Sequence, residues 1–409
     1  MHNVKRMWAL LGVIAAVAAV LATAAGASRK AGPTLVIWTD ANRAPAVTKV
    51  ANAWASANGA TVQVVTKDFG SIETDLGTVA AAQAPDVVLA ANDWTGQLAA
   101  NGLVEPLYPS AAVKKQFPSY TLNGFSYGTA IKKLYGIPVQ VENIGLLVNT
   151  KLAPVPTTWA QVESTALKFK KKNHLAFGLC VQQGSGGDAY HMYPLFSGLG
   201  GYVFGTNSAG NLDPSNIGVA NKAFIKNAAL INKWNKEGLI RSEVTSDTCQ
   251  AAFTKGQTPY WITGPWNDQV IEKAGIHFKV VQVPKIVDPA VPFLGINGVM
   301  VTKYATVHNV DAAAKDLVLN YFSTPSAQTQ LAAAGGRAPA NINAKASDPI
   351  LAEYGAASKG GVAMPNIPQM ASVWGDLGAA WVRSTKGAGA MPAARSFEGA
   401  AKSIADKIG

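Results

Sequence analysis

Short apolar runs alternate along the chain with segments in which apolar residues recur at helical spacing. Residues 34–38 form an apolar run that ends in a polar loop, and residues 47–54 then place apolar side chains on one helical face. Two more apolar runs, at 62–65 and 86–90, follow the same scheme. Short buried strands separated by helices are typical of a βαβ sheet with helices on both faces. The pattern therefore predicts an α/β fold.

The alternation pauses at residues 136–143 and then starts again. An apolar run at 144–148 precedes a helix that opens at Thr158 and a strand near residues 177–179. This restart predicts a second domain, and a chain of 409 residues is too long for one compact core. Near the C-terminus, residues 393–408 carry one apolar stripe, which predicts a docking helix.

The N-terminal segment has the pattern of a secretion signal over residues 1–27. Lys5 and Arg6 precede an uncharged run that ends in small residues at positions 25–27. We expect cleavage before Ser28 and export to the periplasm or to the outer face of the cytoplasmic membrane. The alternative is an uncleaved anchor, because a run of about 20 apolar residues is just long enough to span a bilayer. The small residues at its end favour cleavage.

The charge balance is basic, with a formal net charge of +11, and only 14% of the residues are charged. Such a balance is compatible with nucleic acid, with an anionic envelope surface, or with an acidic or salty medium. No nucleic-acid-binding signature is present, and the one basic run, at residues 168–172, falls on the polar side of a predicted helix. We therefore expect a solvated helix face and no nucleic-acid partner.

Cofactor and metal chemistry find little support in the sequence. Cys180 and Cys249 could pair in an oxidising compartment or lie buried as small apolar residues, and their distance in the chain does not decide between the two. No histidine or cysteine cluster has metal-ligand spacing. The glycines at 184–187 are not followed by the Gly-Lys-Ser/Thr of a phosphate loop. We expect neither a metal nor a cofactor.

Polar side chains gather at the ends of two predicted strands. Asp40, Asn42 and Arg43 follow the first strand, and Asp93 and Trp94 follow the third. Ligands of open α/β sheets bind beyond the carboxyl ends of the strands, where these loops would converge. One such residue is usually a helix cap, but several at corresponding ends predict a ligand site.

Aromatic residues recur at positions where the chain turns. Tyr190 and Tyr193 share one face of a predicted helix, and Trp266 stands at a bend after a strand. Trp374 follows residues 364–370, whose two prolines fix φ and withhold backbone donors, so that this segment must be a rigid loop. Large aromatics held in this way serve either a core or a flat-faced ligand.

Six motifs in order carry a resemblance to a known family. They are TLVIWTDAN, APDVVLAANDW, GIPVQVENIGLLVN, TTWAQV, AAFTKGQTPYWITGPW and AMPNIPQMASVW, of which GPW and MPNIPQM are the specific signals. The chain resembles the maltose/maltodextrin-binding protein family, the substrate-binding components of sugar ABC importers. The resemblance implies two α/β lobes of the periplasmic-binding-protein type, with a ligand cleft between them that closes by hinge motion.

The same resemblance implies the lobe boundaries and the biological role. An N-terminal lobe would comprise residues 33–140 and 298–343, and a C-terminal lobe residues 142–295 and 346–409. The protein would be a monomeric, non-catalytic binder that captures maltose or maltodextrin-type oligosaccharides and delivers them to an ABC permease in the membrane.

The candidate site follows from matching positions to the family. A pyranose offers a rim of hydroxyls and a patch of C–H groups, so it needs polar groups and flat rings. The resemblance implies polar contacts from Asp40, Asn42, Arg43, Asp93, Trp94 and Glu142, and contacts on the stacking side from Asp188, Tyr190, Tyr193, Trp266 and Trp374. Trp94 stands where the family has a basic residue, Tyr193 where it has an indole, and Gly375 and Gly378 where it has further contacts. These departures leave the length and linkage of the sugar open.

An enzyme is the alternative to a binding protein. A secreted glycoside hydrolase needs two carboxyl groups about 5 to 10 Å apart, and Asp40, Asp93, Glu142 and Asp188 offer candidates without singling out a pair. Residues 124–128 (GFSYG) match an esterase pattern, but they precede another predicted strand in a hairpin-like context rather than a strand–turn–helix elbow. We therefore favour a binding protein over either enzyme.

Overall fold

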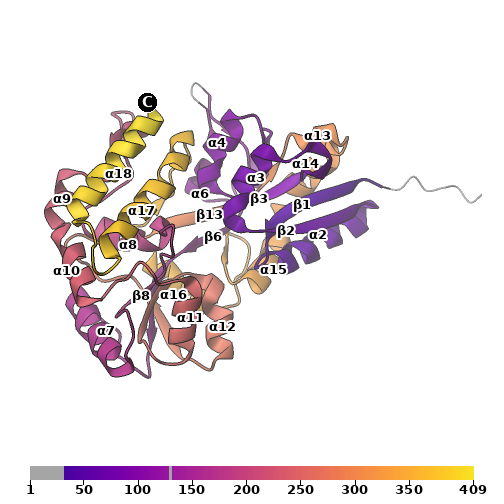
Figure 1. Ribbon diagram of the computed structural model, residues 1–409. Coiled ribbons are helices and arrows are strands. Elements are labelled where there is room, and N and C mark those ends of the chain that lie inside the picture. Colours follow the sequence, from indigo (N-terminus) through magenta and orange to yellow (C-terminus); the bar gives the residue numbers. More distant parts are fainter. Residues whose placement is uncertain (1–31, 129–130) are drawn as a thin grey trace, which may run out of the picture.

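The computed structural model describes residues 32–128 and 131–409 and has an α/β fold of two lobes, each built on its own sheet (Figure 1). The predicted signal or anchor at residues 1–27 lies outside the described residues. Among the residues that are described, none of the helices is long and apolar enough to cross a membrane.

The first lobe contains a seven-stranded sheet with the order β14–β6–β13–β3–β1–β2, in which β15 pairs with the start of β13. Its strands are β1 (Thr34–Asp40), β2 (Thr61–Lys67), β3 (Val87–Ala91), β6 (Ile137–Asn143), β13 (Phe293–Val301), β14 (Ala338–Pro339) and β15 (Val362–Ala363). β1 runs parallel to β2 and β3, which confirms the predicted parallel start. β13 returns from far along the chain and is antiparallel to β3 and β6, so the complete sheet is mixed.

The second lobe contains a four-stranded sheet with the order β12–β7–β11–β8. Its strands are β7 (Gly145–Asn149), β8 (Cys180–Val181), β11 (Tyr260–Thr263) and β12 (Phe278–Val281), and a separate ribbon pairs β9 (Phe204–Thr206) with β10 (Leu212–Ile217). Cys180 on β8 and Cys249 on the neighbouring helix are both free and buried, so the thiols are unpaired in this structure.

The GFSYG segment lies in a small ribbon of β4 (Ser126–Tyr127) and β5 (Lys133–Leu134), which are antiparallel. The Ser126 hydroxyl donates a hydrogen bond to the backbone oxygen of Leu122, 2.8 Å away. This serine is on a hairpin strand and not on a strand–turn–helix elbow, as the sequence predicted, so the esterase hypothesis has no structural basis.

Helices cover both sheets (Figure 1). Around the first sheet lie α2 (Ala44–Asn58), α3 (Ile72–Thr78), α4 (Thr95–Ala100), α5 (Ala111–Lys114), α6 (Ser119–Gly124), α13 (Tyr304–Val307), α14 (Asp311–Asp316), the π-helical segment Leu317–Phe322 and α15 (Pro325–Gly335). Val47, Val50 and Trp54 form the buried stripe of α2, at the spacing that predicted this helix.

The helices of the second lobe include the predicted C-terminal one. They are α7 (Trp159–Asn173), α8 (Ala189–Gly198), α9 (Lys222–Asn227), α10 (Ala229–Glu237), α11 (Ser246–Thr254), α12 (Asp268–Lys273), α16 (Ile350–Ala357), α17 (Trp374–Thr385) and α18 (Ala393–Ile408). Thr158 and Gln161 form a capping box at the start of α7. α18 has the predicted bounds, and Phe397 and Ile404 are fully buried on its apolar stripe.

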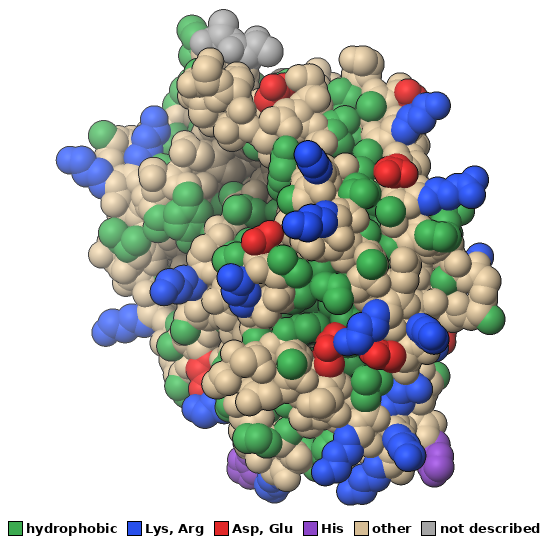
Figure 2. Space-filling model, turned by 90° about the vertical axis from the view of Figure 1, so that its left-hand side faces the viewer, with side chains coloured by type: hydrophobic (Ala, Val, Ile, Leu, Met, Phe, Trp, Pro, Cys, Tyr) green, Lys and Arg blue, Asp and Glu red, His purple; other side chains and the backbone are tan. Residues whose placement is uncertain are grey.

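The basic run lies in the last turns of α7, where Lys168, Lys171 and Lys172 are exposed. Figure 2 shows the side of the molecule that is on the left in Figure 1, and its Lys and Arg side chains are spread over the whole face. The predicted solvated helix face is therefore confirmed.

The chain passes between the two sheets at strands that continue from one lobe to the other. β6 leads through Ile144 directly into β7, and the loop after β12 returns to β13. The rigid loop at residues 364–370 makes another passage, from β15 to α17, through the short 3₁₀ helix η6 (Pro368–Ser372).

This proline-rich loop docks on the first lobe. The Asn366 side-chain amide donates to three backbone oxygens at the end of α6 and the start of β4, at 2.8 to 3.0 Å. A Cβ at Gly96, on α4, would lie 2.5 Å from the Asn366 oxygen, so the close approach of helix and loop requires glycine there. The loop is therefore held by packing as well as by its prolines.

Candidate functional site

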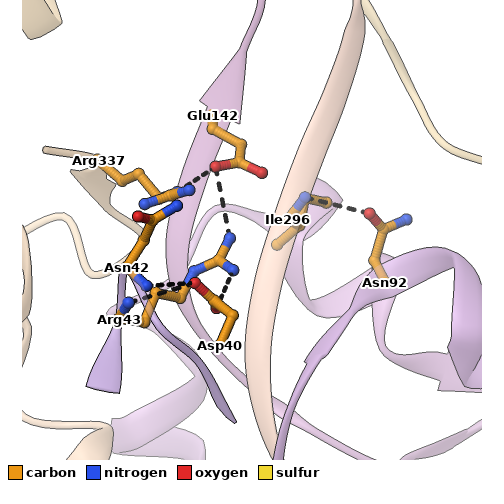
Figure 3. A network of polar contacts seen from close by, with 7 residues as sticks. All are labelled: Asp40, Asn42, Arg43, Asn92, Glu142, Ile296 and Arg337. Carbon is orange, nitrogen blue, oxygen red and sulfur yellow. Dashed lines mark hydrogen bonds and ion pairs between the residues drawn. The ribbon is translucent and has the colours of Figure 1, made fainter. Parts of the chain in front are cut away.

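Four buried charges of alternating sign lie where the two sheets meet (Figure 3). Asp40, at the end of β1, accepts a 2.6 Å hydrogen bond from Arg43 Nη1 and a 3.0 Å bond from the backbone N–H of Asn42. Arg43 Nη2 lies 3.6 Å from Glu142 Oε2 on β6, and Arg337 Nε donates to the same oxygen. The polar end of β1 is thereby connected to the crossover strand.

The four charged side chains of this charge chain, Asp40, Arg43, Glu142 and Arg337, stabilise one another. Burial alone would raise the pKa of Glu142, but Arg337 and Arg43 outweigh it and the pKa is lowered. Burial likewise opposes ionisation of Asp40, and the attraction of Arg43 again leaves the pKa lowered. Both carboxyl groups are therefore ionised at neutral pH, and each is occupied by a guanidinium.

A second polar group joins the first lobe to α17. Trp374 Nε1 donates a 2.9 Å hydrogen bond to Asp93 Oδ2, while Asp93 Oδ1 has no hydrogen-bond partner among the described residues. Burial raises the pKa of Asp93 to about 6. Glu73 on α3 stands close by, and burial together with the charge of Asp93 raises its pKa to about 8. Near neutral pH, Glu73 therefore holds a proton that it can donate.

Aromatic side chains form a wall beside these charges. Tyr190, at the start of α8, lies 6.3 Å from the Trp266 ring and 6.4 Å from the Phe293 ring, and Phe293 lies 5.8 Å edge-on from Trp374. Arg337 Cζ lies 5.6 Å from the centre of the Trp266 ring. Tyr190, Trp266 and Trp374, which the sequence predicted for this site, are therefore brought together next to the charge chain.

The close approach of this wall to the charges depends on Gly295, on β13. A Cβ at that position would lie 3.0 Å from Glu142 Cγ and 3.1 Å from the Tyr190 hydroxyl. The Tyr190 hydroxyl is shielded from solvent and makes no hydrogen bond within the described part of the chain. Such a group costs free energy until something pairs with it.

Three of the predicted residues differ in how much surface they present. Trp94 is 7% exposed and its ring lies 4.8 Å from that of Phe69. Tyr193 is 4% exposed and stacks on Phe293 at 3.5 Å. Asn42, in contrast, is exposed at the loop after β1. Tyr193 therefore packs against the wall through Phe293, whereas Trp94 packs on Phe69, and direct contact of either residue with a ligand stays a prediction.

Asp188 caps α8. Its Oδ1 accepts a 2.9 Å hydrogen bond from the backbone N–H of His191, and its Oδ2 accepts a 2.8 Å bond from Gln182 Nε2. His191 Nδ1 lies 2.8 Å from the same Oδ2. Burial would raise the pKa of Asp188, but His191 and the hydrogen bonds lower it.

Sequence reasoning missed four residues of this site: Glu73, His191, Phe293 and Arg337. Arg337 and Glu73 stand alone in their segments and give no local signal. The sequence did offer a signal for His191, because it lies between Tyr190 and Tyr193 on a helix that was already assigned to the site.

The site is closed in this structure. Asp93 Oδ1, the Tyr190 hydroxyl and His191 Nε2 are all shielded from solvent and lack a hydrogen-bond partner among the residues described. A cavity of about 160 Å³ is lined by Glu142, Pro265, Leu294, Tyr354 and neighbouring residues. A ligand that uses these atoms must enter while the lobes are apart.

Comparisons with known proteins agree on one family. The model of the bacterial extracellular solute-binding protein family matches residues 49–358. A galactooligosaccharide-binding protein of Bacillus subtilis (strain 168) is 27% identical over 85% of this chain and 83% of its own length. A maltotriose-binding protein of Pyrococcus abyssi (strain GE5 / Orsay) is 27% identical over 77% of this chain and 69% of its own length. A maltodextrin-binding protein of B. subtilis (strain 168) is 27% identical over 78% and 76%.

We predict that Glu142→Gln destabilises the fold by about 3–5 kcal/mol, because it leaves Arg43 and Arg337 buried without their shared carboxylate. Glu398→Gln, at an exposed position of α18, is the control and should change stability by less than about 0.5 kcal/mol. Urea unfolding at pH 7 measures both. Equal stability of the two variants would show that the charge chain is dispensable.

We also predict that Glu73 makes the fold less stable as the pH rises. Its pKa is raised from 4.5 to about 8, so the folded state favours the protonated form, and this advantage is lost as the pH climbs from 4.5 through about 8. The free energy of unfolding of Glu73→Gln, relative to that of the unmodified chain, should therefore increase by about 1–3 kcal/mol from pH 5 to pH 9. Urea unfolding at both pH values tests this, and parallel pH profiles would contradict it.

Proposed function

The chain belongs to the bacterial extracellular solute-binding protein family, and from that premise we propose that it captures an oligosaccharide between its lobes and delivers it to an ABC permease. The permease lies in the membrane, and the binding protein acts as a monomer in the periplasm or on the outer face of the cytoplasmic membrane. The lobes of this proposal are residues 33–140 with 298–343, and residues 142–295 with 346–409.

One observation carries the proposal. The aromatic wall of Tyr190, Trp266 and Trp374 stands beside polar atoms that have no partner among residues 32–128 and 131–409, including the Tyr190 hydroxyl and Asp93 Oδ1. Flat rings suit the C–H face of a pyranose, and isolated donors and acceptors suit its hydroxyls. The neighbouring charges are already paired with one another, which favours an uncharged ligand.

Closure of the lobes provides the mechanism. Trp374 bonds Asp93 on the first lobe, and Arg337 of the first lobe lies over Trp266 of the second. A sugar that touches both lobes stabilises only the closed form, so it shifts an open–closed equilibrium towards closure. The permease then recognises the closed shape and receives the sugar.

The names of the relatives narrow the proposed ligand to a few classes of sugar. The three relatives are named for galactooligosaccharides, maltotriose and maltodextrin, which are all built from linked sugars. We propose a maltodextrin-type ligand as the first choice, because the MPNIPQM and GPW motifs resemble the maltodextrin-binding proteins. A galactooligosaccharide is the nearest competitor.

A secreted glycoside hydrolase is the second candidate, and the pair of Glu73 and Asp93 is the observation that favours it. Both carboxyl groups have raised pKa values, about 8 and about 6, as an acid and a partner carboxylate would. Against it, Asp40, Glu142 and Asp188 are occupied by cations or hydrogen-bond donors, and the relatives are named as binding proteins.

Titration of the exported chain with maltotriose and with a β-galactotriose, followed by tryptophan fluorescence, tests the proposal. Reducing ends are assayed afterwards in the same tubes. Saturable binding without new reducing ends supports the binding function, and new reducing ends would favour the hydrolase. An absence of any response to both sugars would contradict the proposed ligand class.

We predict that Trp266→Ala and Trp374→Ala each weaken sugar binding by about 1–3 kcal/mol without unfolding the protein, because each removes one stacking surface. Tyr108→Ala, at a 74% exposed aromatic away from the site, serves as control and should leave affinity unchanged. Calorimetric titration measures all three variants. Unaltered affinity in both tryptophan variants would remove these residues from the site.

A further inference from the structure

The carboxylate of Asp188 has little capacity left for a ligand. One oxygen accepts the backbone N–H of His191, and the other accepts Gln182 Nε2 and faces His191 Nδ1 at 2.8 Å. A carboxylate has about four acceptor sites, and these two hydrogen bonds and the ion pair with His191 use most of them. Its role in the site is therefore better explained through its neighbours.

His191 is the neighbour of Asp188 that has a ring nitrogen available for a ligand. The residue is only 5% exposed, and its Nε2 makes no hydrogen bond to any described residue. Its ring lies edge-on to Trp266 at 5.5 Å and edge-on to Tyr190 at 5.8 Å, so it belongs to the aromatic wall. A histidine that merely fills a core would have both ring nitrogens satisfied.

We propose that His191, through Nε2, is the group at the start of α8 that hydrogen-bonds a hydroxyl of the bound sugar, and that Asp188 acts by positioning it. This inference rests on the proposed function and deepens it, because it names a residue that selects among sugars. The ligand group is a neutral hydroxyl next to the ring face that stacks on Trp266.

The geometry explains how the pair works. In the neutral imidazole, a proton on Nδ1 beside the Asp188 carboxylate leaves the lone pair of Nε2 free to accept a hydroxyl hydrogen. The edge contact with Trp266 fixes the imidazole relative to the stacking surface. A sugar that presents a hydroxyl at the right carbon satisfies Nε2, whereas one that lacks it leaves a buried acceptor unpaired, which penalises binding strongly.

Two substitutions of His191 distinguish the roles of its two ring nitrogens. In His191→Asn the amide can replace Nδ1 beside Asp188 but nothing replaces Nε2, whereas His191→Gln can carry a polar atom to the Nε2 position. With maltotriose or β-galactotriose as the probe, we expect His191→Asn to raise the dissociation constant about tenfold or more, and His191→Gln to raise it less. The thermal midpoint of His191→Asn should stay close to that of the unmodified chain, because the helix cap is kept.

A double-mutant cycle tests the positioning role of Asp188. Asp188→Asn keeps a capping oxygen, and if Asp188 acts through His191 it should weaken sugar binding in the unmodified chain but add nothing in His191→Asn. Fully additive losses would mean that Asp188 contacts the sugar itself, and would overturn the inference.

Monodeoxy analogues of the same trisaccharide remove sugar hydroxyls one at a time, and their binding to the unmodified chain is compared with binding to His191→Asn. One deoxy position should weaken binding to the unmodified chain by a similar factor to His191→Asn, and should cost nothing further in that variant. Unchanged affinity in His191→Asn would overturn this inference while leaving the sugar-binding function intact. If the unmodified chain binds neither trisaccharide, the proposed function fails and the inference fails with it.

Discussion

The buried charge chain of Asp40, Arg43, Glu142 and Arg337 is the constraint on which the centre of this molecule depends. Removing ions from water is costly, so each of these side chains must keep its partner for the fold to tolerate them. These four side chains connect the end of β1, the crossover strand β6 and the segment before β14. Their contacts also hold Arg337 over the Trp266 ring. The position of the aromatic wall relative to the first lobe therefore follows from electrostatics as much as from apolar packing.

The same constraint separates two kinds of polar group in the site. Asp40, Glu142 and Asp188 are predicted ligand contacts, and each already accepts hydrogen bonds from neighbouring side chains or backbone. Within the described part of the chain, the Tyr190 hydroxyl and His191 Nε2 are shielded from solvent and have no hydrogen-bond partner. Under the proposed function, such a site selects a sugar by the placement of its hydroxyls rather than by charge.

Local patterns made much of this fold predictable. The bounds of α18, the parallel pairing of β1 with β2 and β3, and the hairpin at Ser126 all follow from periodicity and turn chemistry over a few residues. Arg337 was not predictable, because its partner Glu142 lies 195 positions earlier in the chain and only the folded sheet brings them together. The rigid loop was predictable because its prolines act locally. The surface on which Asn366 docks was not predictable, because it comes from a segment far away in the sequence.

The place of β13 in the first sheet has a consequence for the order of events during synthesis. This strand lies between β6 and β3, although more than 140 residues separate its start from the end of β6. The first lobe therefore cannot insert β13 into its sheet until nearly three quarters of the chain has left the ribosome, and such long-range pairing is intrinsically slow. Late folding keeps the chain extended for longer, which is the state that a translocation channel for unfolded polypeptides accepts.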